Sequence, residues 1–171
     1  MKGIVQGIDA LNKLLRYFAA FLMAVMTALI AYQVVVRMLS AYTDLQLPRW
    51  TEELARYAMI WLVFVGASLA VRYSALIGME AIAERLSDSA KKILRLTVLV
   101  ISMTLFIVMI VYGFEMITHV SSQLSPGLKI SMAIPYAAIP VSGIFMLLNS
   151  IAVFIEVWNN ETNREFFKGS E

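Results

Sequence analysis

Two long apolar runs are separated by the stretch Pro48-Arg49-Trp50-Thr51-Glu52-Glu53-Leu54-Ala55-Arg56. No charged residue occurs from position 17 to 36 before it or from 57 to 71 after it. Pro48 suits a first helical turn, and Glu52 and Glu53 then lie where the helix dipole favours anions. Trp50 has the amphipathic ring that prefers the headgroup level of a membrane. We therefore expect an interfacial segment over residues 48–56 that leads into a second membrane-spanning helix. An anchor whose charges simply face water is the plainer interpretation.

The composition places this chain among integral membrane proteins. Of the 171 residues, 60% are hydrophobic and 15% are charged, whereas a globular domain is about 45–50% apolar and about 25% charged. The chain has no Cys, which excludes disulfides and thiolate chemistry. Its basic residues are spread among loops, which argues against a nucleic-acid partner. The first apolar run exceeds the core of a signal peptide and lacks an A-x-A-like cleavage site, so we expect it to be a retained span.

The apolar pattern predicts an all-α membrane domain over residues 1–171, with four transmembrane helices at about 14–39, 54–71, 92–120 and 131–158. The second run is short, so Arg56 is expected to snorkel from its end. Short interfacial amphipathic helices are expected at residues 1–14 and 79–86. Pro135 and Pro140 predict a kinked or unwound start to the fourth span, and Ser125-Pro126-Gly127 predicts a turn before it.

The distribution of lysine and arginine predicts the orientation. The two ends and the middle linker carry most of the basic residues, whereas the two other loops carry Arg49 and Lys129, with Arg37 and Arg56 near span ends. Because positive loops stay in the cytoplasm, we expect both termini inside and the Trp50 segment outside. The first group comprises Lys2, Lys13, Arg16, Arg72, Arg85, Lys91, Lys92, Arg95, Arg164 and Lys168.

Small residues at helical spacing predict close helix contacts. Gly66 and Ala70 form a small-xxx-small pair in the second span, and alanines line one flank of the first span. Such residues allow another helix to approach closely in a membrane, although ordinary alanine in a helix remains an alternative. The flank consists of Ala20, Ala24, Ala28 and Ala31.

Ionised or polar groups within the spans need partners, because a charge at a helix centre costs about 2.5–3.5 kcal/mol on insertion scales. Arg37 lies near the Trp50 side of the first span, where an ion pair with Glu52 or Glu53 would pin the interfacial segment. Glu115 and His119 are four residues apart on one face of the third span. They form either a satisfied pair at the water interface, a contact to another chain or a proton relay. Asn149 and Glu156 are the polar candidates of the fourth span.

The sequence offers no enzyme constellation. It has one His and no Gly-rich phosphate loop, and we expect no cofactor on this chain. Four spans can hardly enclose a substrate pathway alone. The chain therefore serves a larger partner, or it acts as an oligomeric small transporter or channel.

The pattern resembles the small membrane subunit of TRAP (tripartite ATP-independent periplasmic) transporters, the DctQ-like family. The stretch from Trp50 to Tyr57 matches its most recognisable motif, and Arg37, Gly66 and Arg72 follow the family spacing. Ile134-Pro135 and Ile139-Pro140-Val141-Ser142-Gly143 resemble its last span, and the likeness covers about residues 15–155. The chain departs from the family at Leu76 and Glu80, where His and Asp are frequent.

The resemblance implies a scaffold role in the bacterial or archaeal cytoplasmic membrane. The chain would bind a large membrane subunit (the M subunit), which carries the sodium and substrate sites and moves as an elevator. A periplasmic substrate-binding protein (the P subunit) would deliver a carboxylate solute. The residues expected to be structural or at interfaces are Arg37, Trp50, Glu52, Glu53, Arg56, Gly66, Arg72, Glu115, Pro135 and Pro140, with membrane lipid as a further partner.

Overall fold

A computed structural model describes residues 2–40, 48–74 and 88–158. These residues form α1 (Lys2–Ser40), α2 (Arg49–Ser74), α4 (Asp88–Val120), α5 (Ala133–Tyr136) and α6 (Ala138–Trp158). Four segments are long and apolar enough to cross a membrane, namely Val5–Ser40, Arg49–Tyr73, Lys92–Val120 and Ala133–Trp158. The predicted all-α, four-span fold is therefore confirmed.

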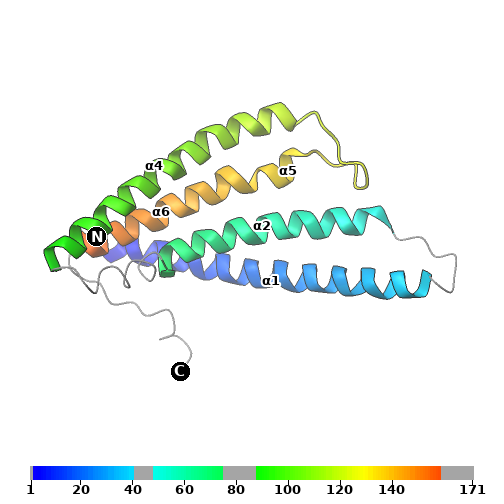
Figure 1. The fold of residues 1–171 in the computed structure, drawn as a ribbon, viewed down its shortest axis with the longest axis horizontal. Coiled ribbons are helices and arrows are strands. Elements are labelled where there is room, and N and C mark those ends of the chain that lie inside the picture. The colour runs from blue at the N-terminus through cyan, green and yellow to red at the C-terminus, as the bar shows by residue number, and fades with distance from the viewer. Residues whose placement is uncertain (1, 41–47, 75–87, 159–171) are drawn as a thin grey trace, which may run out of the picture.

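The long helices stand side by side in the order α4, α6, α2, α1 (Figure 1). α6 packs against both α4 and α2, whereas α1 packs mainly against α2 and α4 mainly against α6. Successive membrane spans run antiparallel, so each end of the row brings together the starts and ends of different helices. The Trp50 end holds the start of α2 and the loop before α5, and the Arg72 end holds the start of α1 and the end of α6.

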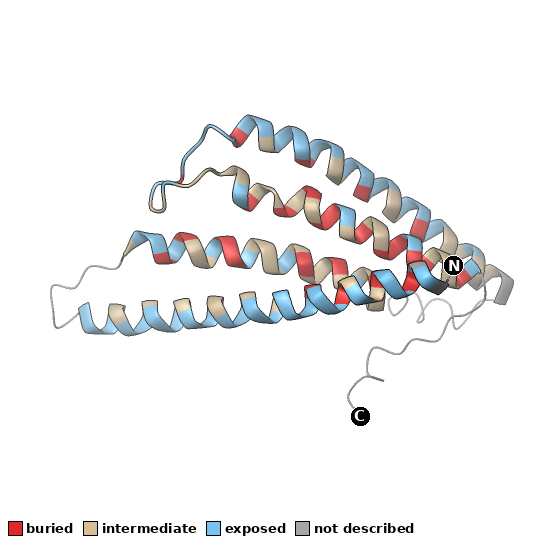
Figure 2. Ribbon diagram, turned by 180° about the vertical axis from the view of Figure 1, so that it is seen from behind, coloured by how far each residue is buried: buried red, intermediate tan, exposed pale blue. Residues whose placement is uncertain are grey.

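Burial within the chain follows this row (Figure 2). Half of the most apolar stretch of the fourth span is buried (50%), against 6% for the first span and 11% for the third. The second span, next to α6, is intermediate at 28%. The outer helices α1 and α4 thus leave most of their apolar surface to lipid or to another protein.

The contact between α4 and α6 depends on two glycines. A Cβ on Gly113 would lie 2.8 Å from Cδ of Pro140, and a Cβ on Gly143 would lie 3.0 Å from Cγ1 of Ile110. The first distance is shorter than real Cβ contacts, and the second is tight enough that Ile110 would have to shift, so the two glycines allow the helices to approach closely. Toward the Arg72 end the same contact is filled by a small apolar cluster of Leu99, Val153 and Val157.

The fourth span begins as the prolines predict. α5 and α6 are separated at Ala137, with Pro135 in the first helix and Pro140 in the second, and both prolines are buried. The indole Nε1–H of Trp61 donates a hydrogen bond to the carbonyl oxygen of Ile134 (3.2 Å). A side chain of α2 thus satisfies backbone near the break, as the bilayer interior requires.

One predicted boundary needs correction. The amphipathic lead-in expected over residues 1–14 is the first part of α1, which continues without a break to Ser40. The interfacial segment 48–56 leads into the second span as expected, and it forms the first turns of α2. The helix expected at 79–86, the departures at Leu76 and Glu80, and the tail 159–171 lie outside the described residues.

Candidate functional site

Glu53 fastens the start of α2 to the loop that precedes α5. Its Oε1 accepts a hydrogen bond from the backbone N–H of Gly127 (2.7 Å), and its Oε2 accepts one from Leu128 (2.8 Å). Consecutive backbone N–H groups form a concave site for anions, and here a carboxylate of the same chain fills it. Gly127 favours this close approach, because a Cβ there would lie 3.0 Å from Cδ of Glu53 and the carboxylate would have to shift.

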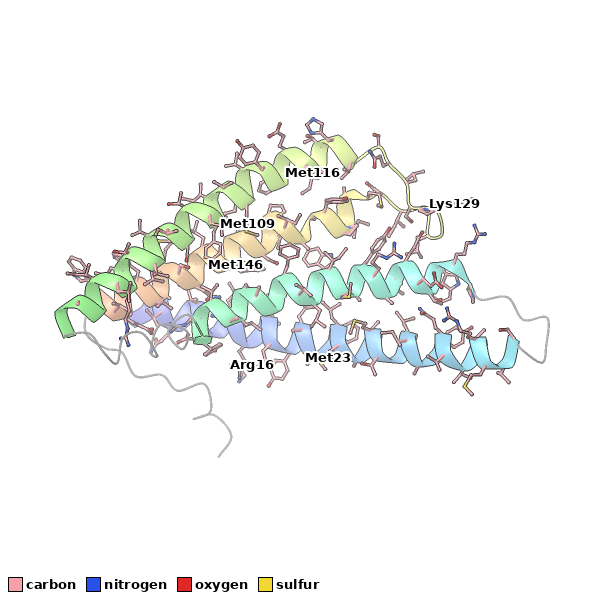
Figure 3. All side chains as sticks on the ribbon, viewed as in Figure 1. Arg16, Met23, Met109, Met116, Lys129 and Met146 are labelled. Atoms are coloured by element: carbon pink, nitrogen blue, oxygen red, sulfur yellow. The ribbon has the colours of Figure 1, made fainter. Side chains whose placement is uncertain are left out.

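The loop that Glu53 holds is a tight hairpin. Ser125 N–H donates to the carbonyl of Ile130 (2.9 Å), and Met132 N–H donates to the carbonyl of Gln123 (2.9 Å). Lys129 adopts a positive φ of 54° at the turn, and Figure 3 shows it at the Trp50 end. The predicted Ser125-Pro126-Gly127 turn is confirmed at the tip of this hairpin.

Arg72 joins three helices at the opposite end. Its Nη1 and Nη2 donate to the two carboxylate oxygens of Glu156 on α6 (2.6 and 2.8 Å). Its Nε donates to Oδ1 of Asp9 on α1 (3.0 Å). The guanidinium side chain is only 2% exposed, and such two-point pairing fixes orientation as well as distance. We call these three residues the Arg72 clamp.

Near the clamp, two amides pair between α1 and α6. Asn12 Nδ2 donates to Asn149 Oδ1 (2.6 Å), and Asn149 Nδ2 donates to Asn12 Oδ1 (3.0 Å) and to the carbonyl of Ser68 on α2 (2.7 Å). Both asparagines are 1% exposed. The amide pair and the Arg72 clamp therefore tie the same three helices together, using groups that would be unfavourable if left alone in lipid.

The other residues expected near the Trp50 end lie on the surface of the chain. Trp50, Glu52, Arg56 and Arg37 are all exposed. The ion pair expected between Arg37 and Glu52 or Glu53 is not formed: Glu53 binds the hairpin loop, and Arg37 has no ion pair with a described residue. Arg37 is near the end of α1 and Glu53 near the start of α2. Their proximity in the sequence suggested an ion pair that the structure does not contain.

Glu115 and His119 are both exposed on α4, at the edge of the row. His119 Nδ1 lies 2.8 Å from the backbone carbonyl oxygen of Glu115, so the contact expected between the two side chains runs to the backbone instead. This is a local contact within one helix. It leaves the Glu115 carboxylate directed to the surroundings of the chain.

The small residues for which close helix contacts were predicted, Gly66 and the alanine flank of α1, do not pack closely against another described helix. A Cβ on Gly66 would have no neighbouring atom within 4 Å. The alanine flank of α1 is exposed along its length, at Ala20, Ala24, Ala28 and Ala31. The close approach expected from their spacing is therefore not formed among the described residues. It occurs instead at Gly113 and Gly143, which were not predicted, and the α1 and α2 surfaces are left available to other molecules.

Two residues of the Arg72 clamp and the amide pair, Asp9 and Asn12, were not predicted as site residues. The signal was present: Val5, Ile8 and Leu15 are buried around them, so the two polar groups lie within an apolar helical face. A polar side chain in such a face needs an internal partner. Because residues 1–14 were expected to lie on the membrane surface, their apolar face was assigned to lipid, and no internal partner was sought for Asp9 and Asn12.

Comparisons with known proteins give a consistent result. A family model described as "Tripartite ATP-independent periplasmic transporters, DctQ component" matches residues 26–160. The chain is 29% identical over 147 residues to the isethionate TRAP transporter permease protein DctMQ of Oleidesulfovibrio alaskensis. The alignment covers 82% of this chain but only 22% of that relative.

Proposed function

Since the chain belongs to the DctQ family of TRAP transporter components, we propose that it is the small scaffold subunit of such a transporter in the inner membrane. Members of this family are components of transporters and are not enzymes. The proposed partner is a large membrane subunit that carries the sodium and solute sites and moves as an elevator. The relative is far longer than this chain, which supports a function that needs additional polypeptide.

The scaffold role is supported chiefly by the contacts of the buried charged and polar side chains, which pair with one another between helices. Arg72 is satisfied by Asp9 and Glu156, and Asn12 is satisfied by Asn149. In a transporter, buried ionisable groups line a path or bind ions, whereas here they bind helices to one another. The open surfaces of α1 and α4 leave room for a partner on both sides of the row.

The proposed solute is a small organic anion delivered by a periplasmic binding protein. A carboxylate is the class implied by the resemblance of the sequence, and the relative of Oleidesulfovibrio alaskensis is named for isethionate, which is a sulfonate. The proposed orientation places the Arg72 end in the cytoplasm. Lys13, Arg16, Lys92 and Arg95 lie toward that end, in agreement with the distribution of positive charge.

The test is co-expression of the tagged chain with the large subunit, followed by purification and sodium-driven uptake in vesicles. We expect the two chains to purify together, uptake only when both are present, and none from this chain alone. Arg37→Ala and Glu53→Ala should reduce recovery of the complex without changing the KM for solute. Uptake by the chain alone would instead support an oligomeric small transporter, and Glu115→Gln should then abolish it.

A further inference from the structure

A cavity of about 360 Å³ lies at the Trp50 end between α2 and the start of the fourth span. From α2 it is lined by Tyr57, Ile60 and Phe64, and from the opposite wall by Pro135, Tyr136 and Ile139. Arg56 and Glu53 also contribute to the lining. The cavity is thus an apolar space between two membrane-spanning segments with charged groups in one part of its wall.

The order of the lining residues on α2 gives the cavity a direction. Arg56, Ile60 and Phe64 follow one another at four-residue spacing, so they share a helix face that runs about 12 Å along the axis. Arg56 is also only about 9 Å along the helix from Trp50, which favours the headgroup level. Along this face the wall therefore changes from the cationic Arg56 to apolar side chains as it passes from the headgroup level into the membrane, while the Glu53 carboxylate in the same part of the lining is bound to the hairpin loop.

Arg56 is the group that calls for a ligand. It is exposed and forms no hydrogen bond or close ion pair with a described residue. Glu53, three residues earlier, is near enough to interact with it electrostatically. However, both Glu53 oxygens already accept hydrogen bonds from the hairpin loop. The guanidinium has several free donors and the fork geometry that matches a phosphate.

We propose that this cavity binds one phospholipid, with an acyl chain between α2 and α5–α6 and the phosphate on Arg56. An amphiphile with an anionic head and an apolar tail matches the two ends of the cavity in sign, order and depth. Arg56 can snorkel to the headgroup level while its methylene stem covers the cavity mouth. The lipid would fill the cavity between α2 and the start of the fourth span. This inference does not depend on which large subunit the chain assembles with.

The test uses the full chain in vesicles of phosphatidylglycerol that carries a photoreactive diazirine in one acyl chain. After irradiation, labelled positions are mapped by peptide mass spectrometry. We expect labels concentrated at Ile60, Phe64 and Ile139 in excess of Phe21, an exposed residue on the α1 surface. Arg56→Gln should lower cavity labelling about fivefold, the effect of removing one basic residue near an anionic surface.

Two further variants make the result decisive. Ile60→Trp fills the cavity and should reduce its labelling while the label on Phe21 is kept. Arg49→Gln removes an exposed arginine of the same helix end that does not line the cavity, and it should change nothing. Labelling equal at Phe21 and in the cavity, or unaffected by Arg56→Gln and Ile60→Trp, would overturn the proposal. So would a photoreactive residue at Ile139 that crosslinks the large subunit instead of lipid in the purified complex.

Discussion

Replacing Asn149 by leucine tests whether the amide pair holds α1 and α6 together. The side chain makes three hydrogen bonds, two with Asn12 and one with the carbonyl of Ser68. Leucine has the same number of side-chain heavy atoms and the same branching at Cγ, so the change removes the bonds without opening a cavity. The Ser68 carbonyl keeps its place in the helical ladder of α2, and the amide of Asn12 is the group left without a partner.

The magnitude follows from these contacts. An interhelical hydrogen bond in a membrane contributes about 0.6 kcal/mol on average, so three contribute about 2 kcal/mol. A buried amide left unsatisfied adds about 1–3 kcal/mol. We therefore expect Asn149→Leu to lower the free energy of unfolding by about 3–5 kcal/mol. The double variant Asn12→Leu/Asn149→Leu should lower it by only about 2 kcal/mol, because no amide remains unpaired.

The assay is a double-mutant cycle on the purified chain in mild detergent, with unfolding by dodecyl sulfate followed through tryptophan fluorescence. Ser150→Ala serves as the matched control, because the Ser150 hydroxyl is also buried on α6 but has no hydrogen-bond partner among the described residues. It should leave the free energy of unfolding nearly unchanged. If the effects of Asn12→Leu and Asn149→Leu simply add, the two amides are not coupled and the reasoning is refuted.

Three other changes probe the remaining contacts. Glu53→Gln keeps one acceptor oxygen and should expose the backbone N–H of Gly127 to faster hydrogen exchange; unchanged protection would show that the carboxylate is not what holds the loop. Arg72→Ala removes the guanidinium that joins the carboxylates of Asp9 and Glu156. It should destabilise the chain by about 3–5 kcal/mol, measured by the same unfolding assay, whereas Arg72→Lys should lose less. A destabilisation equal for both variants would argue against two-point pairing. Gly113→Ala should lower the free energy of unfolding by about 1–3 kcal/mol through overpacking. Gly66→Ala, with open space around it, should leave that free energy unchanged in the isolated chain. Similar losses of stability from both variants would contradict the close approach of α4 to α6.

The sequence predicted the number and position of the spans well, because membrane thickness imposes a length and composition on each helix. The proline-marked break before α6 was equally accessible, since Pro135 and Pro140 remove backbone donors wherever they are placed. The continuity of α1 with the lead-in of residues 1–14 was not. Charged residues such as Glu52 and Lys13 mark a water boundary, but they do not end a helix.

Partners across helices were the least predictable part of the site. Glu53 was expected to pair with Arg37, yet its partner is the backbone of Gly127 and Leu128, and no sequence pattern identifies such backbone N–H groups. Arg72 pairs with Asp9 and Glu156, which are 63 and 84 residues away along the chain. Such pairs depend on which helices are neighbours in the row, and periodicity within a single helix says nothing about that order.

The contacts that lock the helices have a consequence for biogenesis. Asn149 and Glu156 lie on the last helix, whereas the groups they satisfy, Asn12 and Arg72, enter the bilayer with the first two. During synthesis the ribosome must complete α6 before either lock can close. A nascent chain that stalls earlier would retain an unpaired amide and an arginine with half of its carboxylate partners, and membrane proteases could recognise it as unfinished by those groups.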